Sequence, residues 1–244
     1  DLDANVKLLQ NYAENKGYFR AKTTGDTVVK GKRGSAKYIV ETGDQYKINS
    51  VHFPGDSDTL SKTIAQTEDH SLLKPGDPFD LEVIRGERTR IDAILKEKGF
   101  YFFGPDFLLL KTDSTIGNNL VDMYLTVKPE TPKQATEIYS INDVYIYSNY
   151  SLNSARLDTS KKDEQIYKGY HIIDRKQRFK PYVFEEAMQF KPGDVYNRTD
   201  HNQTLNRLIN LNVFKFVKNR FEVAKTDSPK LDVFYYLTPL PQKS

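Results

Sequence analysis

The stretch Lys74-Pro75-Gly76-Asp77-Pro78-Phe79-Asp80 decides how this chain is interpreted, because it occurs again as Lys191-Pro192-Gly193-Asp194-Val195-Tyr196-Asn197. After both stretches come a helical pattern, a turn containing a large apolar or aromatic residue, and two strand-like runs. A third copy begins later in the pattern: a helical stretch is followed by Lys16-Gly17-Tyr18-Phe19 and again by two strand-like runs. Recurrence of one pattern is the signature of repeated structural units. We therefore expect tandem small modules rather than one large domain.

The long helix of each copy is predicted from aliphatic residues spaced three and four positions apart, which places them on one face. These residues are Leu81, Ile84, Ile91 and Leu95 in the middle copy, Leu205, Leu208 and Ile209 in the last, and Val6, Leu9 and Ala13 in the first. Asp80 can cap the start of the middle helix, and Asn197 or Thr199 that of the last. Gly99 and Gly17 can end their helices in a left-handed conformation. The stripes are expected to be core faces.

Strand-like runs surround these helices in a fixed order. Opening strands are predicted at 46–55 and 138–147, and short helices at 59–67 and 181–189. The later strand pairs are predicted at 19–22 with 37–40, at 107–110 with 120–127, and at 216–223 with 231–237. The order is β-α-α-β-β, so the predicted fold is α+β, with each module a three-stranded mixed sheet covered by two helices.

Three modules are predicted: the C-terminal part of a first over 1–45, a second over 46–132, and a third over 133–244. The first lacks its opening strand and short helix. Either that half was removed, or the truncated copy packs against the next module. The third carries a polar insertion near 148–168, expected to be a loop or a mobile hairpin.

The module order, the Gly-Asp turns at Gly43, Gly76 and Gly193, and the Lys-Gly-aromatic turn after the helix resemble POTRA domains. These domains belong to the outer-membrane β-barrel assembly family that includes BamA and TamA. The resemblance covers essentially the whole chain and implies a periplasmic region of an outer-membrane protein, without chemistry or cofactors. It also implies a C-terminal membrane β-barrel in the parent chain, unfolded outer-membrane protein clients, and accessory lipoproteins or periplasmic factors as partners. The insertion is unusual for a minimal module and leaves the branch of the family open.

A three-stranded sheet has two edges, whose unpaired N–H and C=O groups can pair with an extended peptide. If the family arrangement holds, the strand directly after the long helix lies at an edge. The candidate client-binding residues are Phe107, Leu108, Leu109, Leu110 and Lys111 in the second module, and Phe216, Val217, Lys218, Asn219, Arg220 and Phe221 in the third. The first set is unusually apolar and is favoured for that reason. The alternative, that both are ordinary strands paired with nothing further, stays open.

Two groups of basic residues could contact anionic lipid headgroups or an acidic partner, although a solvated polar face is the alternative. One group is Arg85, Arg88 and Arg90 in the middle helix, and the other is Arg175, Lys176, Arg178 and Lys180 before the short helix of the third module. The second group is favoured, because its module is expected to lie nearest the membrane.

Composition and motifs argue against other classes of protein. Thirty-six Lys and Arg are interleaved with 33 Asp and Glu, which does not form the basic stripe of a nucleic-acid-binding protein. Cysteine is absent, and the four histidines lack metal-ligand spacing, so we expect no metal site. The run Gly31-Lys32-Arg33-Gly34-Ser35 lacks the spacing of a phosphate-binding loop and is interpreted as a hairpin turn. No catalytic motif is found, and no stretch has the length of a membrane helix.

The sequence thus favours a soluble, non-enzymatic piece of a periplasmic assembly or translocation factor that binds clients by strand pairing. A structural spacer or protein-interaction module of a secretion or cell-division component is the rival interpretation. A hydrolase with an unrecognised site is a third, which would require a deep pocket lined by carboxylates or histidines.

Overall fold

The structure is a computed structural model that describes residues 1–151 and 161–241. The chain forms two compact units. The N-terminal unit comprises Asp1–Ala93 and Gly104–Thr131, and the C-terminal unit comprises Ile94–Phe103 and Pro132–Ser244. Both contain helices and sheets, which confirms the α+β class.

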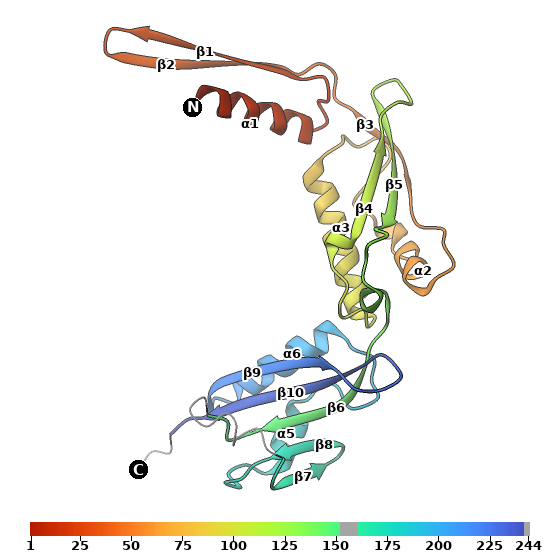
Figure 1. The fold of residues 1–244 in the computed structure, drawn as a ribbon, viewed down its shortest axis with the longest axis vertical. Coiled ribbons are helices and arrows are strands. Elements are labelled where there is room, and N and C mark those ends of the chain that lie inside the picture. The colour runs from red at the N-terminus through yellow and green to blue at the C-terminus, as the bar shows by residue number, and fades with distance from the viewer. Residues whose placement is uncertain (152–160, 242–244) are drawn as a thin grey trace. The chain divides into compact units, whose positions relative to one another are not determined.

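The N-terminal unit begins with a helix that lies along a hairpin (Figure 1). Helix α1 covers Leu2–Asn15, and strands β1 (Lys22–Lys30) and β2 (Arg33–Glu41) pair antiparallel around the turn at 31–32. The hairpin turn predicted over 31–35 is present, but it is confined to 31–32 because β2 already begins at Arg33. The strand predicted at 19–22 was wrong in its bounds, because it begins only at Lys22, while Phe19 packs against the core of the next elements.

The elements that follow form a complete β-α-α-β-β module within this unit, apart from the end of its long helix. They are β3 (Lys47–His52), α2 (Thr59–Ala65), η1 (Glu68–His70), α3 (Leu81–Glu97), η2 (Pro105–Phe107), β4 (Leu108–Asp113) and β5 (Leu120–Val127). The sheet order is β3-β5-β4, with β3 parallel and β4 antiparallel to β5. This is the predicted three-stranded mixed sheet.

One buried ion pair supports α3. The Glu87 side chain is fully buried and accepts hydrogen bonds from Arg90 at 2.7 Å and from the Leu72 amide at 2.9 Å. Burial alone would raise the pKa of Glu87, but these hydrogen bonds outweigh it and lower the pKa below its usual value. The carboxylate therefore stays charged and holds the segment before α3 against the helix.

The C-terminal unit repeats the module with a larger sheet. Its elements are η3 (Lys133–Thr136), β6 (Ser140–Tyr147), β7 (Glu164–Tyr167), β8 (Tyr170–Ile173), α5 (Pro181–Ala187), α6 (Arg198–Asn210), β9 (Phe214–Val223) and β10 (Lys230–Pro239). The strand order is β7-β8-β6-β10-β9, in which β6 is parallel to both β10 and β8.

The three-stranded sheet predicted for this module was therefore incomplete, because β7 and β8 add two strands. Lys168 and Gly169 link them with φ angles of 48° and 89°, the positive values that a two-residue hairpin turn requires. The segment 148–168, predicted to be a loop or a mobile hairpin, thus ends in a strand of the sheet; its residues 152–160 lie outside the described residues.

Apolar residues pack on both faces of the five-stranded sheet. The main core lies beneath the helices and includes Phe184, Leu208 and Tyr235. A second cluster contains Tyr145, Tyr147, Ile173 and Tyr236, in which the rings of Tyr147 and Tyr236 stack at 5.4 Å between centroids. The central strands β6 and β10 therefore contribute side chains to clusters on both faces.

Substituting Phe184→Ala is predicted to destabilise the C-terminal unit by about 3–5 kcal/mol, the usual cost of removing a fully buried aromatic side chain. Tyr182→Ala on the same helix is the matched control, because Tyr182 is 46% exposed. Urea unfolding followed by amide hydrogen exchange resolves the two units. Equal losses for the two variants would contradict this account of the core.

Candidate functional site

Two strands end their sheets on an open side. In the described residues, β4 pairs only with β5, and β9 pairs only with β10. The strand directly after the long helix is thus an edge strand in both sheets, as the family arrangement implied. An edge strand exposes N–H and C=O groups along its free side.

The β4 edge is less apolar at its surface than the sequence suggested. Phe107 belongs to the 3-10 turn η2, and Leu108 is 1% exposed within the core. Leu110 packs against the core around Met123. Leu109, 37% exposed, and Lys111 face outward. Most of the apolar character that singled out this strand therefore serves internal packing.

The β9 edge is longer and alternates regularly. Val217, Asn219 and Phe221 are half-buried, and Val217 and Phe221 pack against the main core. The intervening residues Phe216, Lys218 and Arg220 are exposed. Ten residues of edge backbone are therefore presented beside a row of exposed aromatic and cationic side chains.

The Arg220 side chain belongs to a wider cation–aromatic surface. Its guanidinium carbon lies 5.3 Å from the Phe234 ring centroid, and its Nε donates to Glu222 at 2.9 Å. A planar guanidinium cation is attracted to the face of an aromatic ring in this arrangement. They hold Arg220 on the sheet surface next to the open edge.

The side chain of His201, on α6, contacts two residues of β9. The Asn219 amide Nδ2 donates to His201 Nε2 at 2.9 Å, so His201 Nδ1 carries the proton and donates to the Tyr196 hydroxyl at 2.9 Å. The Phe221 ring lies 4.2 Å from the imidazole. Burial, with Arg198 adding to it, lowers the pKa of His201 and keeps the ring neutral. No local sequence pattern links His201 to β9, and sequence reasoning missed this role.

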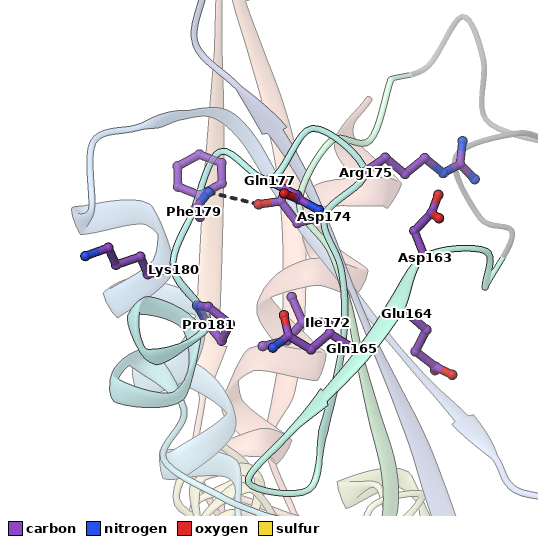
Figure 2. A pocket seen from close by; sticks show the side chains of 10 residues that line it. All are labelled: Asp163, Glu164, Gln165, Ile172, Asp174, Arg175, Gln177, Phe179, Lys180 and Pro181. Atoms are coloured by element: carbon purple, nitrogen blue, oxygen red, sulfur yellow. Dashed lines mark hydrogen bonds between the residues drawn. The ribbon is translucent and has the colours of Figure 1, made fainter.

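The second basic group lies on the connection between β8 and α5. Arg175 and Lys180 line a cavity of about 620 Å³, and their side chains extend to opposite sides of it (Figure 2). Asp163, Glu164 and Asp174 line the same cavity, so the charge there is mixed rather than basic.

The other two members of this group do not add a common basic surface. Lys176 is exposed, and Arg178 Nη2 donates to the Leu240 carbonyl at 3.4 Å. Asp174 accepts a hydrogen bond from the Phe179 amide at 2.9 Å, which folds the connection back on itself. The four cations therefore lie close in sequence without forming one basic surface, because only Arg175 and Lys180 line the cavity. Their contact with lipid or an acidic partner stays a prediction.

The basic residues of α3 are engaged in ion pairs. Arg85 pairs with Glu82, Arg88 with Asp106, and Arg90 with Glu87. Within residues 1–151 and 161–241, no group of three acidic or histidine side chains is placed to hold a metal ion. In the same ranges, no helix combines the length and apolar character needed to cross a membrane.

Comparison with known proteins matches one segment of the chain to a family model. Residues 168–239 match the model of the POTRA family, described as a surface antigen variable number repeat. The resemblance to POTRA domains is confirmed. No curated protein sequence matches the chain. The matched segment contains β8, α5, α6, β9 and β10.

Solved structures share the fold over more of the chain. The crystal structure of Haemophilus influenzae BamA POTRA3-5 matches 97% of this chain and 79% of its own, with a TM-score of 0.52 and 18% identity. BamA from Haemophilus ducreyi lacking POTRA domains 1-3 matches 80% of this chain and 30% of its own, with a TM-score of 0.52 and 13% identity. At these identities the likeness concerns the fold.

The buried neutral His201 predicts an acid-sensitive module. Because its folded pKa is lowered, the stability tied to the neutral ring is present above the unfolded pKa of about 6.5 and decreases as the pH falls below it. Wild-type protein should lose more thermal stability between pH 7 and pH 5.5 than a His201→Gln variant. Parallel melting-temperature curves for the two proteins over this range would show that His201 is not buried in its neutral form.

Proposed function

We propose that this chain is the periplasmic POTRA region of an outer-membrane protein assembly or translocation factor. It acts as a scaffold without catalysis, built from modules over 1–45, 46–132 and 133–244, and a membrane β-barrel follows in the parent chain. The family match over 168–239 and the shared fold with BamA POTRA structures support the proposal.

The open β9 edge is the observation that carries a binding role. Pairing through backbone N–H and C=O groups needs an extended guest but little sequence identity. Such pairing suits unfolded outer-membrane proteins, whose strands differ in sequence but share an extended, alternating pattern. Accessory lipoproteins or other periplasmic factors would use the same edges by contributing a strand.

Both predicted edges remain candidates, and the burial of their side chains supports a different order from that favoured by the sequence. The sequence favoured β4 for its leucines, but Leu108 and Leu110 are occupied in the core. On β9 the outward Phe216 is 54% exposed, and β9 has 10 residues where β4 has 6. We therefore propose β9 as the principal client edge and the β4 edge around Leu109 as a shorter second one.

Proline variants separate client binding from the rival role of a spacer. Alternate N–H groups of an edge strand point outward, so only one of Lys218→Pro and Asn219→Pro breaks the β9–β10 ladder. The variant that keeps the wild-type melting temperature should bind an unfolded outer-membrane β-barrel protein about fivefold or more weakly, since an outward donor is lost. Fluorescence anisotropy with a labelled client measures the change.

The control is Asp227→Pro, which places proline in the exposed turn between β9 and β10. Leu109→Pro tests the β4 edge in the same assay. Unchanged affinity in the stable β9 variant would remove this edge from the proposal. Absence of client binding by the wild-type chain would favour a spacer.

A further inference from the structure

The turn that closes the long helix has a glycine in two copies and an asparagine in the third. We call the turns at 16–19, 98–101 and 211–214 the first, second and third knuckle. Gly17 and Gly99 are buried and have φ angles of +87° and +97°. Asn212 has a φ of +55° and is exposed.

The first knuckle is seated in the elements that follow it within the N-terminal unit. The Gly17 carbonyl accepts a hydrogen bond from the Tyr46 amide at 2.9 Å, and the Tyr46 carbonyl accepts one from the Phe79 amide at 2.9 Å. The Phe19 ring lies 4.8 Å from Tyr46 and 4.9 Å from Phe79. A Cβ atom at Gly17 would lie 2.8 Å from the Phe79 carbonyl oxygen, so only glycine permits this approach.

The second knuckle repeats this arrangement within the C-terminal unit. The Gly99 carbonyl accepts from the Tyr139 amide at 2.9 Å, and the Tyr139 carbonyl accepts from the Tyr196 amide at 2.9 Å. The Tyr101 ring lies 4.8 Å from Tyr196. A Cβ atom at Gly99 would lie 2.7 Å from Val195 Cγ1. Tyr46 with Phe79, and Tyr139 with Tyr196, thus form two equivalent sockets.

The third knuckle contacts the segment after β10 instead of a socket. Asn212 adopts the left-handed conformation at a residue that carries a Cβ atom, and its side chain donates to the Asn210 carbonyl at 2.9 Å. The next carbonyl, that of Val213, accepts a hydrogen bond from the Leu240 amide at 2.9 Å. Leu240 lies directly after β10, so the exit segment of the same chain lies against this knuckle.

We infer that the glycine knuckles are docking elements for a following module of this type. The Asn212 knuckle does not dock such a module. A socket like the other two cannot approach Asn212 as closely, because the Cβ atom would meet its backbone or side chains. The exit segment around Leu240 takes that position instead. The third knuckle therefore does not bind a socket of the kind that Tyr46 with Phe79, or Tyr139 with Tyr196, forms. The inference rests on the proposed module boundaries.

The test introduces the asparagine of the third knuckle into the first. In the full chain, Gly17→Asn should increase hydrogen exchange of the Tyr46 amide by about tenfold or more, the factor that corresponds to overpacking a close contact. Gly31→Asn is the matched control, because Gly31 has a φ of +60° and open space around its Cβ position. It also places asparagine at a positive φ angle, but without the collision.

Equal Tyr46 protection in the two variants would overturn the inference, since asparagine would then be compatible with docking. If Gly17→Asn unfolds the N-terminal unit, Gly17→Ala, which adds the Cβ atom alone, provides the same comparison. Leu240→Pro removes the donor to Val213 and should make the segment after β10 more sensitive to protease; unchanged sensitivity would contradict its proposed position. None of these readouts involves a client, so their failure is distinguishable from failure of the proposed function.

Discussion

Parallel pairing of each opening strand with the last strand of its module is the contact on which the rest of the structure depends. It joins β3 to β5 and β6 to β10 across long stretches of sequence. Because the opening strand occupies one side of the last strand, the strand after the long helix can pair only on the other side. That strand, β4 or β9, therefore lies on the outer side of the last strand, and no other strand of the described residues pairs with it. The open edges are consequences of the topology rather than of any special edge sequence.

Local signals predicted much of this fold. The Gly-Asp turns at Gly76 and Gly193 have φ angles of +92° and +94°, and the Asn197 side chain caps α6 by accepting from the Asp200 amide. Signals that depend on contacts distant in sequence were missed. The β7–β8 hairpin was hidden in a polar segment, and its place in the sheet is set by pairing with β6.

For the candidate edges, too, the sequence predicted the order of the strands but not the contacts between residues distant in sequence. The module arrangement implied by the resemblance to POTRA domains identified β4 and β9 as edges. It could not show that Leu108 and Leu110 turn inward, because the direction of side chains depends on the register with β5. It also could not predict the hydrogen bond between His201 and Asn219, since that contact requires α6 to pack against β9.

Backbone geometry at strand edges is the central claim, and amide hydrogen exchange along β9 tests it most directly. With an unfolded outer-membrane β-barrel protein present, alternate β9 amides, those not bonded to β10, should exchange about tenfold or more slowly. The remaining β9 amides should change little. Protection spread evenly over the chain, or confined to residues away from both open edges, would contradict strand pairing as the mode of binding.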